Sequence, residues 1–331
     1  MTAVALVTLD ELRAAQQRIA GVAVRTPLMP CPWADTAADA GGRTLHLKPE
    51  NLQPTGAFKI RGAFNRLSTL TAEERARGVV AQSSGNHAQA VAYAARELGI
   101  KAVIVMPDTS PAVKVDNTRS FGAEVVLVAM HERDTTPADL AAEHGYVWVP
   151  PYDDPWIIAG QGTVGLEIAE DATALDLDLR TVLVPVSGGG LISGVAAALK
   201  LSLPGVRVVG VEPELAGDAT ASFRSGERQV WSFADTHRTI ADGLRTNSLG
   251  VLPWEHIQAY VDDMITVTDD EIRSAVAVLA RRGRLVAETS GAAATAAYLY
   301  HQEQLPPGRS VAAVVSGGNL EPSLLATLLA L

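Results

Sequence analysis

Short runs of β-branched residues alternate along this chain with alanine-rich stretches of helical character. Five of the runs are expected to be buried parallel strands: 101–106, 124–128, 181–186, 206–211 and 310–315. Five of the stretches between them are expected to be helices: 86–98, 111–121, 191–201, 269–282 and 291–304. This alternation predicts an α/β fold with open, mostly parallel sheets flanked by helices. Ligands of such sheets bind at the carboxyl ends of the strands, so the loops that follow strands are where a site is expected.

Size and charge exclude several classes of protein. With 331 residues the chain is long enough for two lobes. Its formal net charge of −10 disfavours nucleic-acid binding, which needs a basic surface. No apolar run reaches the length of a membrane span, and no basic segment followed by an apolar core opens the sequence, so we expect a cytoplasmic protein. The single cysteine, Cys31, excludes an intrachain disulfide and a cysteine-rich metal site.

Lys59 lies in unusual surroundings for a lysine. The chain has 5 lysines against 22 arginines, and this one stands between Phe58 and Ile60 after a Pro-Thr-Gly turn. Burial disfavours the charged ammonium and so lowers the pKa of a lysine in apolar surroundings. A neutral amine can form a Schiff base with a carbonyl such as that of pyridoxal phosphate (PLP). The alternative is a lysine whose stem is buried and whose ammonium head reaches water. The local sequence leaves both open.

A polar loop at residues 82–88 precedes the helix expected at 86–98. Its small hydroxyl residues and glycine would present free backbone N–H groups at the positive end of a helix dipole, an arrangement that binds carboxylate or phosphate. Ordinary capping of the helix by serine or asparagine explains the same residues. Either interpretation fits this loop taken alone.

A second loop, at residues 187–191, holds three consecutive glycines between a strand and a helix. Such a loop lets a phosphate approach the backbone closely, whereas a plain turn seldom needs three glycines. It also supports a rival function, because Gly188, Gly190 and Gly194 approximate a dinucleotide-binding fingerprint, with Glu212 ending the next strand. Three residues separate the last two glycines where that fingerprint has two, and a nicotinamide-dependent oxidoreductase would leave Lys59 unexplained.

Two further segments allow more than one interpretation. Ser316, in the loop 316–319, could hydrogen-bond a neutral pyridine nitrogen or cap the loop. Glu212 and Asp218, with a backbone carbonyl between them, offer oxygen ligands suited to Mg²⁺ or Ca²⁺. For the segment 212–218, spacing alone favours a solvated acidic loop over a cation site.

Ten collinear segments together resemble the serine/threonine dehydratases and serine racemases, which are fold-type II PLP enzymes with the two-lobed fold of the tryptophan synthase β subunit. They span nearly the whole chain: 48–65 with its TGAFKIRGAFN core, SSGNHAQAVAYAA from Ser83, SPAVKVDNTRSFGAEV from Ser110, AGQGTVGLEI from Ala159, PVSGGGLISG from Pro185, GVEPELAGDA from Gly210, TIADGLRT from Thr239, VDDMITVTDDEI from Val261, ETSGAA from Glu288 and SGGN from Ser316.

The resemblance implies which residues bind the cofactor. Lys59 would carry PLP as a Schiff base, with Phe58 beside the cofactor ring. Asn86 would hydrogen-bond the 3′-oxygen of PLP, and Ser316 would meet its pyridine nitrogen. The loop that wraps the phosphate would consist of Ser187, Gly188, Gly189, Gly190 and Leu191.

The resemblance also implies a substrate site. The substrate carboxylate and its surroundings would be held by Ser83, Ser84, Gly85 and His87. In racemase-like members a serine matching Ser84 faces the side of the cofactor opposite the lysine and acts as a second acid/base.

A divalent-cation site and a homodimer are implied as well. The cation, Mg²⁺, Ca²⁺ or Mn²⁺, would be bound by Glu212, the carbonyl of Ala216 and Asp218, which reverses the solvated-loop interpretation. The large cofactor-binding lobe is expected at 1–70 and 156–331 and the small lobe at 71–155.

The reaction implied is β-elimination from L-threonine or L-serine to a 2-keto acid and ammonia, with Lys59 as the base that takes the α-proton. A serine racemase and a threo-3-hydroxyaspartate dehydratase are the alternatives, because both begin with loss of the same α-proton. The nicotinamide-dependent oxidoreductase and a non-catalytic metabolite-binding protein are more distant ones. A small amino-acid substrate is expected in each of the enzymatic cases except the oxidoreductase.

Overall fold

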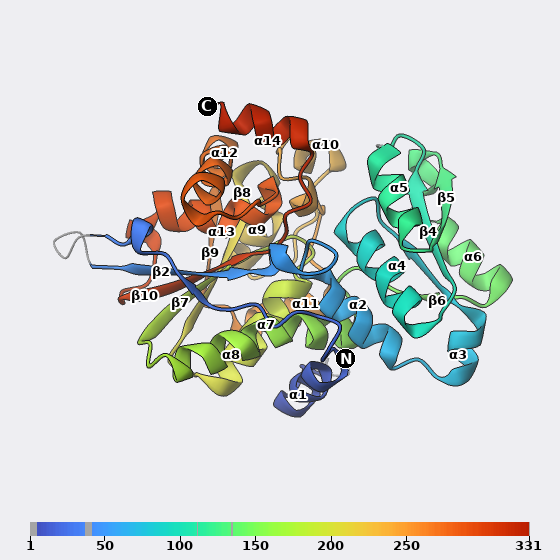
Figure 1. Ribbon diagram of the computed structural model, residues 1–331, viewed down its shortest axis with the longest axis horizontal. Coiled ribbons are helices and arrows are strands. Elements are labelled where there is room, and N and C mark those ends of the chain that lie inside the picture. The colour runs from blue at the N-terminus through green and yellow to red at the C-terminus, as the bar shows by residue number, and fades with distance from the viewer. Residues whose placement is uncertain (1–4, 37–41, 111, 134, 331) are drawn as a thin grey trace.

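Two separate β-sheets organise the chain. The computed structural model describes residues 5–36, 42–110, 112–133 and 135–330. Within these ranges the strands form one six-stranded and one four-stranded sheet. In Figure 1 the four-stranded sheet and its helices make up the part at the right, and the six-stranded sheet lies in the larger part at the left. Helices α2 (Lys59–Ser68) and α7 (Pro155–Ala174) lie where the two parts meet.

The six-stranded sheet is parallel apart from one edge strand, as the alternation of strands and helices predicts. Strand β1 pairs antiparallel with β2, and each of the other neighbours pairs in parallel. The strand order is β1 (Met29–Pro30), β2 (Thr44–Pro49), β10 (Ser310–Val315), β7 (Leu179–Pro185), β8 (Arg207–Pro213) and β9 (Asp263–Val267).

Helices cover both faces of this sheet, which is why its strands are apolar on both sides. Along β10, Ala312 and Val314 belong to one core cluster, and Val311 and Val315 belong to the other. The first face packs against α7, α8 (Gly190–Ser202) and α11 (Val251–Tyr260), with α1 (Leu9–Arg18) outside them. The second face packs against α12 (Asp269–Val278), α13 (Thr289–Tyr300) and α14 (Pro322–Leu329). Helices α9 (Asp218–Ser225) and α10 (Phe233–Thr236) follow β8.

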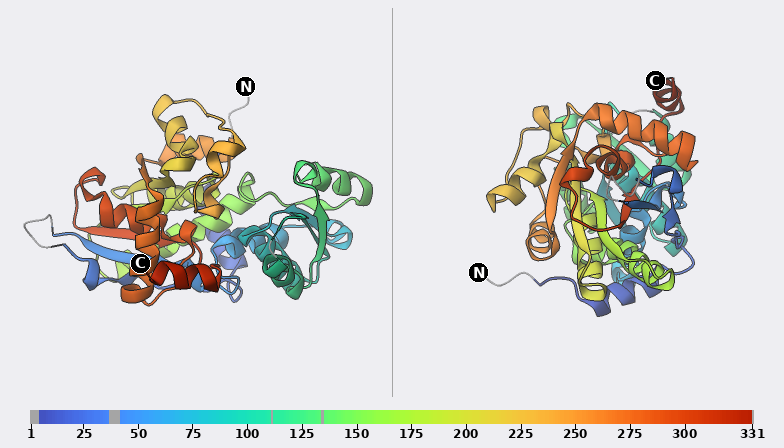
Figure 2. Two further views of the ribbon diagram at one scale, coloured as in Figure 1. Left: turned by 90° about the horizontal axis from the view of Figure 1, so that it is seen from above. Right: turned by 90° about the vertical axis from the view of Figure 1, so that its left-hand side faces the viewer.

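The four-stranded sheet is wholly parallel and has its own core. Its order is β5 (Glu124–Val128), β4 (Ala102–Pro107), β3 (Val79–Gln82) and β6 (Val147–Trp148). One face packs against α2, α4 (Asn86–Leu98) and α5 (Ala112–Ser120), and the other packs against α6 (Thr136–His144). Helix α3 (Ala72–Arg77) leads into β3. In the left view of Figure 2 the two parts, each a sheet with its helices, lie side by side.

Short helical turns complete the description. Those of 3₁₀ type are Pro32–Ala34, Glu50–Leu52, Met130–Glu132, Glu214–Ala216, Asp242–Leu244 and Gln302–Gln304. A π-helical turn at Leu279–Gly283 extends α12.

The predicted α/β fold class is confirmed, and the five expected strands correspond to β4, β5, β7, β8 and β10. The expected helices are found as well: α4 has the expected ends, and each of the other four has at least one shifted end. The helix expected to run to residue 282 is α-helical only to Val278, and α13 begins at Thr289 instead of 291. Pro111, where one helix was expected to begin, lies outside the described residues. The lobe boundaries near residues 71 and 155 stay a prediction.

The three loops that the sequence analysis singled out follow the carboxyl ends of β3, β7 and β10. A parallel sheet therefore presents two of them, 187–191 and 316–319, at one edge. None of the helices in the described ranges combines the length and apolar character that crossing a membrane requires.

Candidate active site

Lys59 is the first residue of α2 and is half-buried. Its Nζ donates a hydrogen bond to the carbonyl of Pro151 at 2.7 Å and lies 5.2 Å from the centroid of the Phe58 ring. Burial lowers the pKa of Lys59 from 10.5 to about 8. The amine thus lies in desolvated surroundings, and this favours a reactive lysine over one whose head reaches water.

The loop before α4 does not cap the helix with its side chains. Gly85 is the N-cap residue and has no side-chain hydrogen bond of the capping type. The hydroxyl of Ser83 instead accepts the N–H of Gly85 at 3.1 Å, while Ser84 lies partly exposed beside it. The first N–H groups of a helix have no partner within the helix. This end of α4 can therefore receive an anion, and the capping interpretation is wrong for this loop.

His87, in the first turn of the helix, is held neutral. Its Nε2 lies 2.9 Å from the carbonyl of Val149, so Nε2 must carry the proton and donate it. Burial, and then the positive charge of Lys59, lower the pKa of His87 to about 3. The ring can orient its neighbours but cannot supply charge to a substrate carboxylate.

Asn86 is fixed by two residues from distant parts of the chain. Its Nδ2 donates to Oε1 of Glu288 at 2.6 Å, and its Oδ1 accepts Nδ2 of Asn319 at 2.7 Å. Burial, followed by the charge of Asp242, raises the pKa of Glu288 to about 8. Sequence reasoning gave Glu288 no role, although it opens one of the segments on which the resemblance rests. No local pattern marks it as buried beside Asn86.

The glycine loop after β7 is shaped by close contacts on one side. A Cβ on Gly188 would lie 2.3 Å from the ring of Tyr152, and one on Gly190 would lie 2.8 Å from Cβ of the same residue. Gly189 has a φ of +92°, a backbone conformation that favours glycine. The hydroxyl of Ser187 lies 2.9 Å from that of Thr246.

This loop feeds directly into α8, a helix of 13 residues that begins at Gly190 and continues through the buried Leu191. The first N–H groups of a helix have no partner within the helix, so this turn, with its dipole and the loop backbone that carries no side chains, could bind an anion. These residues fit the phosphate of PLP.

The loop after β10 lies against the turn that precedes Lys59. The carbonyl of Ser316 accepts the N–H of Phe58 at 3.1 Å, and Gly317 forms a β-bridge with Ala57. A Cβ on Gly317 would lie 2.3 Å from Oε1 of Glu288. Ser316, Phe58 and the Asn86–Glu288 pair are therefore brought together around the start of α2, from segments far apart in the sequence.

The two candidate carboxylates of the acidic loop after β8 are buried, so the solvated-loop interpretation is wrong for them. Glu212 and Asp218 are each 1% exposed. The two oxygens of Glu212 accept the N–H groups of Ala219 and Thr220 at the start of α9. Oδ2 of Asp218 has no hydrogen-bond partner. Burial raises the pKa of both carboxyls, that of Asp218 to about 7.

The described residues contain no cluster of three or more acidic, histidine or cysteine side chains that could hold a metal ion. A cation at the acidic loop would therefore depend on two carboxylates and on backbone oxygen, such as the carbonyl of the buried Ala216.

Gly194 has a structural explanation that removes it from the dinucleotide fingerprint. A Cβ at this position would lie 2.2 Å from the carbonyl of Ile158 and 2.4 Å from the N of Gly162. Gly194 is thus required where α8 crosses α7. Glu212, the acid of the rival fingerprint, caps α9 instead.

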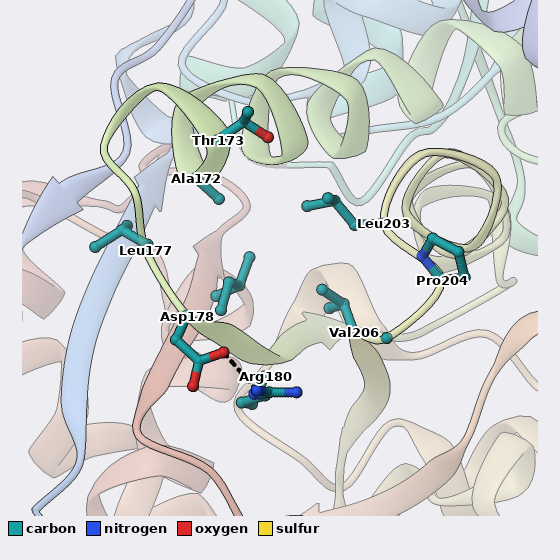
Figure 3. Close-up of a pocket in the computed structure, with 10 residues that line it drawn as sticks. Ala172, Thr173, Leu177, Asp178, Arg180, Leu203, Pro204 and Val206 are labelled. Carbon is teal, nitrogen blue, oxygen red and sulfur yellow. Dashed lines mark ion pairs between the residues drawn. The ribbon is translucent and has the colours of Figure 1, made fainter.

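A hollow of about 270 Å³ lies at the opposite end of β7, between the end of α7 and the end of α8 (Figure 3). Asp178 and Arg180 form an ion pair of 2.7 Å there. The hollow lies at the amino end of β7, whereas Ser187 and the glycine loop follow its carboxyl end. None of the site residues described above lines the hollow.

Comparison with known proteins agrees with this geometry. The family model described as "Pyridoxal-phosphate dependent enzyme" matches residues 19–317. The chain belongs to this family. The resemblance seen in the sequence is confirmed by curated relatives. An L-threonine ammonia-lyase of Thermotoga maritima is 42% identical over 97% of this chain and 77% of its own length. An L-threo-3-hydroxyaspartate ammonia-lyase of Saccharomyces cerevisiae is 40% identical over 97% of this chain and 96% of its own length.

Solved structures of PLP enzymes have the same fold. A threonine deaminase from T.th. superposes with a TM-score of 0.88 at 42% identity, covering 95% of this chain and 99% of the other. A maize serine racemase superposes with a TM-score of 0.89 at 37% identity, covering 98% and 97%. The predicted two-lobed class of fold-type II PLP enzymes is therefore confirmed, and the oxidoreductase alternative finds no support.

Proposed function

We propose that this PLP-dependent enzyme is an ammonia-lyase that converts L-threonine or L-serine to a 2-keto acid and ammonia. The observation that carries the proposal is the amine of Lys59, which donates a hydrogen bond to the carbonyl of Pro151 and lies beside the ring of Phe58. The relatives at 42% and 40% identity act on hydroxy amino acids, which indicates the substrate class.

The cofactor would be held by groups already in position. The N–H groups of residues 187–191 would bind its phosphate, and Asn86, fixed by Glu288, would donate to its 3′-oxygen. Ser316 would meet the pyridine nitrogen, and Phe58 would lie beside the ring. When bound, PLP accepts the electron pair that is left when the substrate loses its α-proton.

Lys59 would bind the cofactor covalently and then act as a base. When the substrate amine has displaced it, its Nζ is free to take the α-proton. A pKa of about 8 leaves about a tenth of the amine neutral at pH 7, far more than for an ordinary lysine. The substrate then loses its β-hydroxyl as water, and hydrolysis of the remaining unsaturated amine gives the 2-keto acid and ammonia.

The loop before α4 would orient the substrate. Ser83, Gly85 and the first N–H groups of α4 would bind its carboxylate at the positive end of the helix dipole. The neutral ring of His87 would support this loop through its bond to Val149. Ser84 would lie on the face opposite Lys59 and exchange a proton with Cα from that side.

Racemisation is the second candidate, and Ser84 together with the serine racemase fold favours it. An acid/base on each face allows the α-proton to leave on one side and return on the other. Dehydration of threo-3-hydroxyaspartate is the third, because the yeast relative carries that activity in its name. All three reactions share the removal of the α-proton by Lys59, and they differ only in the steps after it.

A divalent cation would be bound by Glu212, Asp218 and the carbonyl of Ala216. Two buried carboxylates with raised pKa values, one with an oxygen that has no partner, are stabilised when a cation takes the place of their protons. We further expect a cytoplasmic homodimer, with the active site closed by approach of the lobe 71–155 to the lobe formed by 1–70 and 156–331, which would exclude water.

Release of 2-keto acid tests the proposal. The PLP-loaded protein would be given L-threonine, L-serine, D-serine and threo-3-hydroxyaspartate, with Mg²⁺ and with a chelator, beside the Lys59→Ala variant. Release from L-threonine or L-serine that the variant loses is expected. Turnover unchanged in Lys59→Ala would refute the role proposed for Lys59. No turnover by the wild type with any of these substrates would refute the proposal and favour a metabolite-binding protein.

A further inference from the structure

Four charged side chains form a closed cluster beneath the start of α2. They are two cations and two carboxylates, each at most 5% exposed at the side chain: Lys48, Glu50, Arg61 and Glu167. The cluster is neutral as a whole. It does not touch the groups that would bind cofactor or substrate, and the proposed chemistry does not use it.

Arg61 is the centre of this cluster. Its guanidinium forms a double hydrogen bond with each carboxylate: to Glu50 at 2.7 and 2.8 Å, and to Glu167 at 2.6 and 2.9 Å. It also donates to the hydroxyl of Thr163 and to the carbonyl of Val24, both at 3.1 Å. A planar guanidinium bound on several sides is fixed in position and in rotation.

The cluster joins the two helices on which the reactive amine and its acceptor depend. Arg61 lies two residues after Lys59 in the first turn of α2, while Glu167 and Thr163 lie on α7. Helix α7 begins four residues after Pro151, whose carbonyl accepts the hydrogen bond of Lys59. The helix that carries Lys59 and the helix that follows Pro151 are thus both held by the hydrogen bonds of Arg61.

The packing of the two helices leaves little room for either to shift. A Cβ on Gly160 of α7 would lie 2.5 Å from Cα of Gly62, and the N–H of Gly62 donates to Gln161 at 3.2 Å. A buried set of charges is seldom retained for stability alone, because apolar packing of similar volume is often as favourable. We infer that the cluster instead fixes the position of α2 relative to α7.

We propose that Arg61, held between Glu50 and Glu167, is a positioning residue for Lys59. It fixes the first turn of α2 against α7, so that the amine of Lys59 stays in its desolvated place beside the carbonyl of Pro151. This inference rests on the proposed function only for the role of Lys59. The placement of the amine can be measured without turnover.

The test follows the reactivity of Lys59 in the cofactor-free protein. An amine-reactive acylating reagent is applied between pH 6 and 10, and modification of the peptide that contains Lys59 is measured by mass spectrometry. Only the neutral amine reacts, so the rate reports the pKa of Lys59. The titratable group that faces Lys59 from α4 is His87, which stays neutral throughout this range.

In Arg61→Lys the charge is kept, but the double hydrogen bonds are lost. Water then reaches the amine, and we expect the apparent pKa of Lys59 to rise by about one unit or more, which makes labelling at pH 8 about fivefold slower. Thr163→Val removes a single acceptor of Arg61 and should shift the pKa in the same direction by less. If Arg61→Lys does not fold, the labelling of Lys59 in Thr163→Val tests the proposal.

Lys200→Met is the matched control. Lys200 forms a partly buried ion pair of 2.6 Å with Asp262 at the end of α8, away from Lys59. Its loss should lower the melting temperature and leave the labelling profile of Lys59 unchanged. A wild-type labelling profile in folded Arg61→Lys or Thr163→Val, with only a lowered melting temperature as in the control, would overturn the proposal. If the wild type releases no keto acid, the proposed function is refuted, but the effect of Arg61 on the labelling of Lys59 still holds.

Discussion

Replacing Lys59 by methionine should make the cofactor-free protein more stable at neutral pH. The folded chain holds this amine where its pKa is about 8 instead of the ordinary 10.5, because burial penalises the ammonium. One pKa unit corresponds to about 1.4 kcal/mol, so this shift costs the folded protein about 3 to 4 kcal/mol at most when the amine is protonated. Methionine has similar length and no charge to desolvate.

The gain should depend on pH in a defined direction. Between pH 8 and 10.5 the unfolded chain binds more protons at Lys59 than the folded chain does, so wild-type stability rises with pH in this window. The advantage of Lys59→Met should therefore be largest below pH 8 and fall to less than half of its full size by about pH 9.5. Urea unfolding of both cofactor-free proteins at pH 7 and 9.5 measures it.

Lys48→Met is the control, with the opposite sign expected. Lys48 is fully buried, whereas Lys59 is half-buried, and Nζ of Lys48 lies 2.6 Å from Oε2 of Glu167. Removing one member of a buried ion pair leaves its partner uncompensated and costs about 3–5 kcal/mol. If Lys59→Met destabilises the protein as Lys48→Met does, or if its gain is the same at pH 7 and 9.5, the reasoning about Lys59 is refuted.

Three further outcomes are expected. Ser84→Ala should abolish racemisation and reaction of D-serine while sparing much of the elimination from L-serine, measured by chiral chromatography and keto-acid release; equal loss of both would rule out a two-face mechanism. Gly188→Ala, whose Cβ would meet the ring of Tyr152, should weaken PLP binding at least about tenfold in a spectroscopic titration. Gly205→Ala, with open space around it, should not. Mg²⁺ should raise the melting temperature of wild type and not of Asp218→Asn; an equal rise in both would exclude the proposed cation site.

The fold was predictable because its signals are local. The apolar run 310–315 is buried on both faces of β10 and coincides with that strand, and α4 has the bounds that its sequence indicates. The end of α12 was not predicted, because residues 279–283 continue the helix in π form and Arg284 then adopts a positive φ. Neither feature has a sequence signal as strong as glycine or proline.

The site was predictable only as far as local motifs and the resemblance reach. Lys59 stands out by its surroundings, but its contact with Pro151 joins residues 92 positions apart. The pairing of Arg61 with Glu167 spans 106 positions, and that of Asn86 with Glu288 spans 202. Gly194 resembled part of a nucleotide fingerprint because close helix packing and phosphate binding select the same residue. Such pairings become visible only when the sheets are assembled.

The most direct test of the account is the site at which PLP attaches. The PLP-loaded protein is reduced with borohydride, digested, and searched by mass spectrometry for the pyridoxyl adduct among its five lysines, Lys48, Lys59, Lys101, Lys114 and Lys200. The account predicts a stoichiometric adduct on Lys59, and none in Lys59→Ala. An adduct on one of the other four lysines, or none on Lys59 while PLP stays bound, would contradict it.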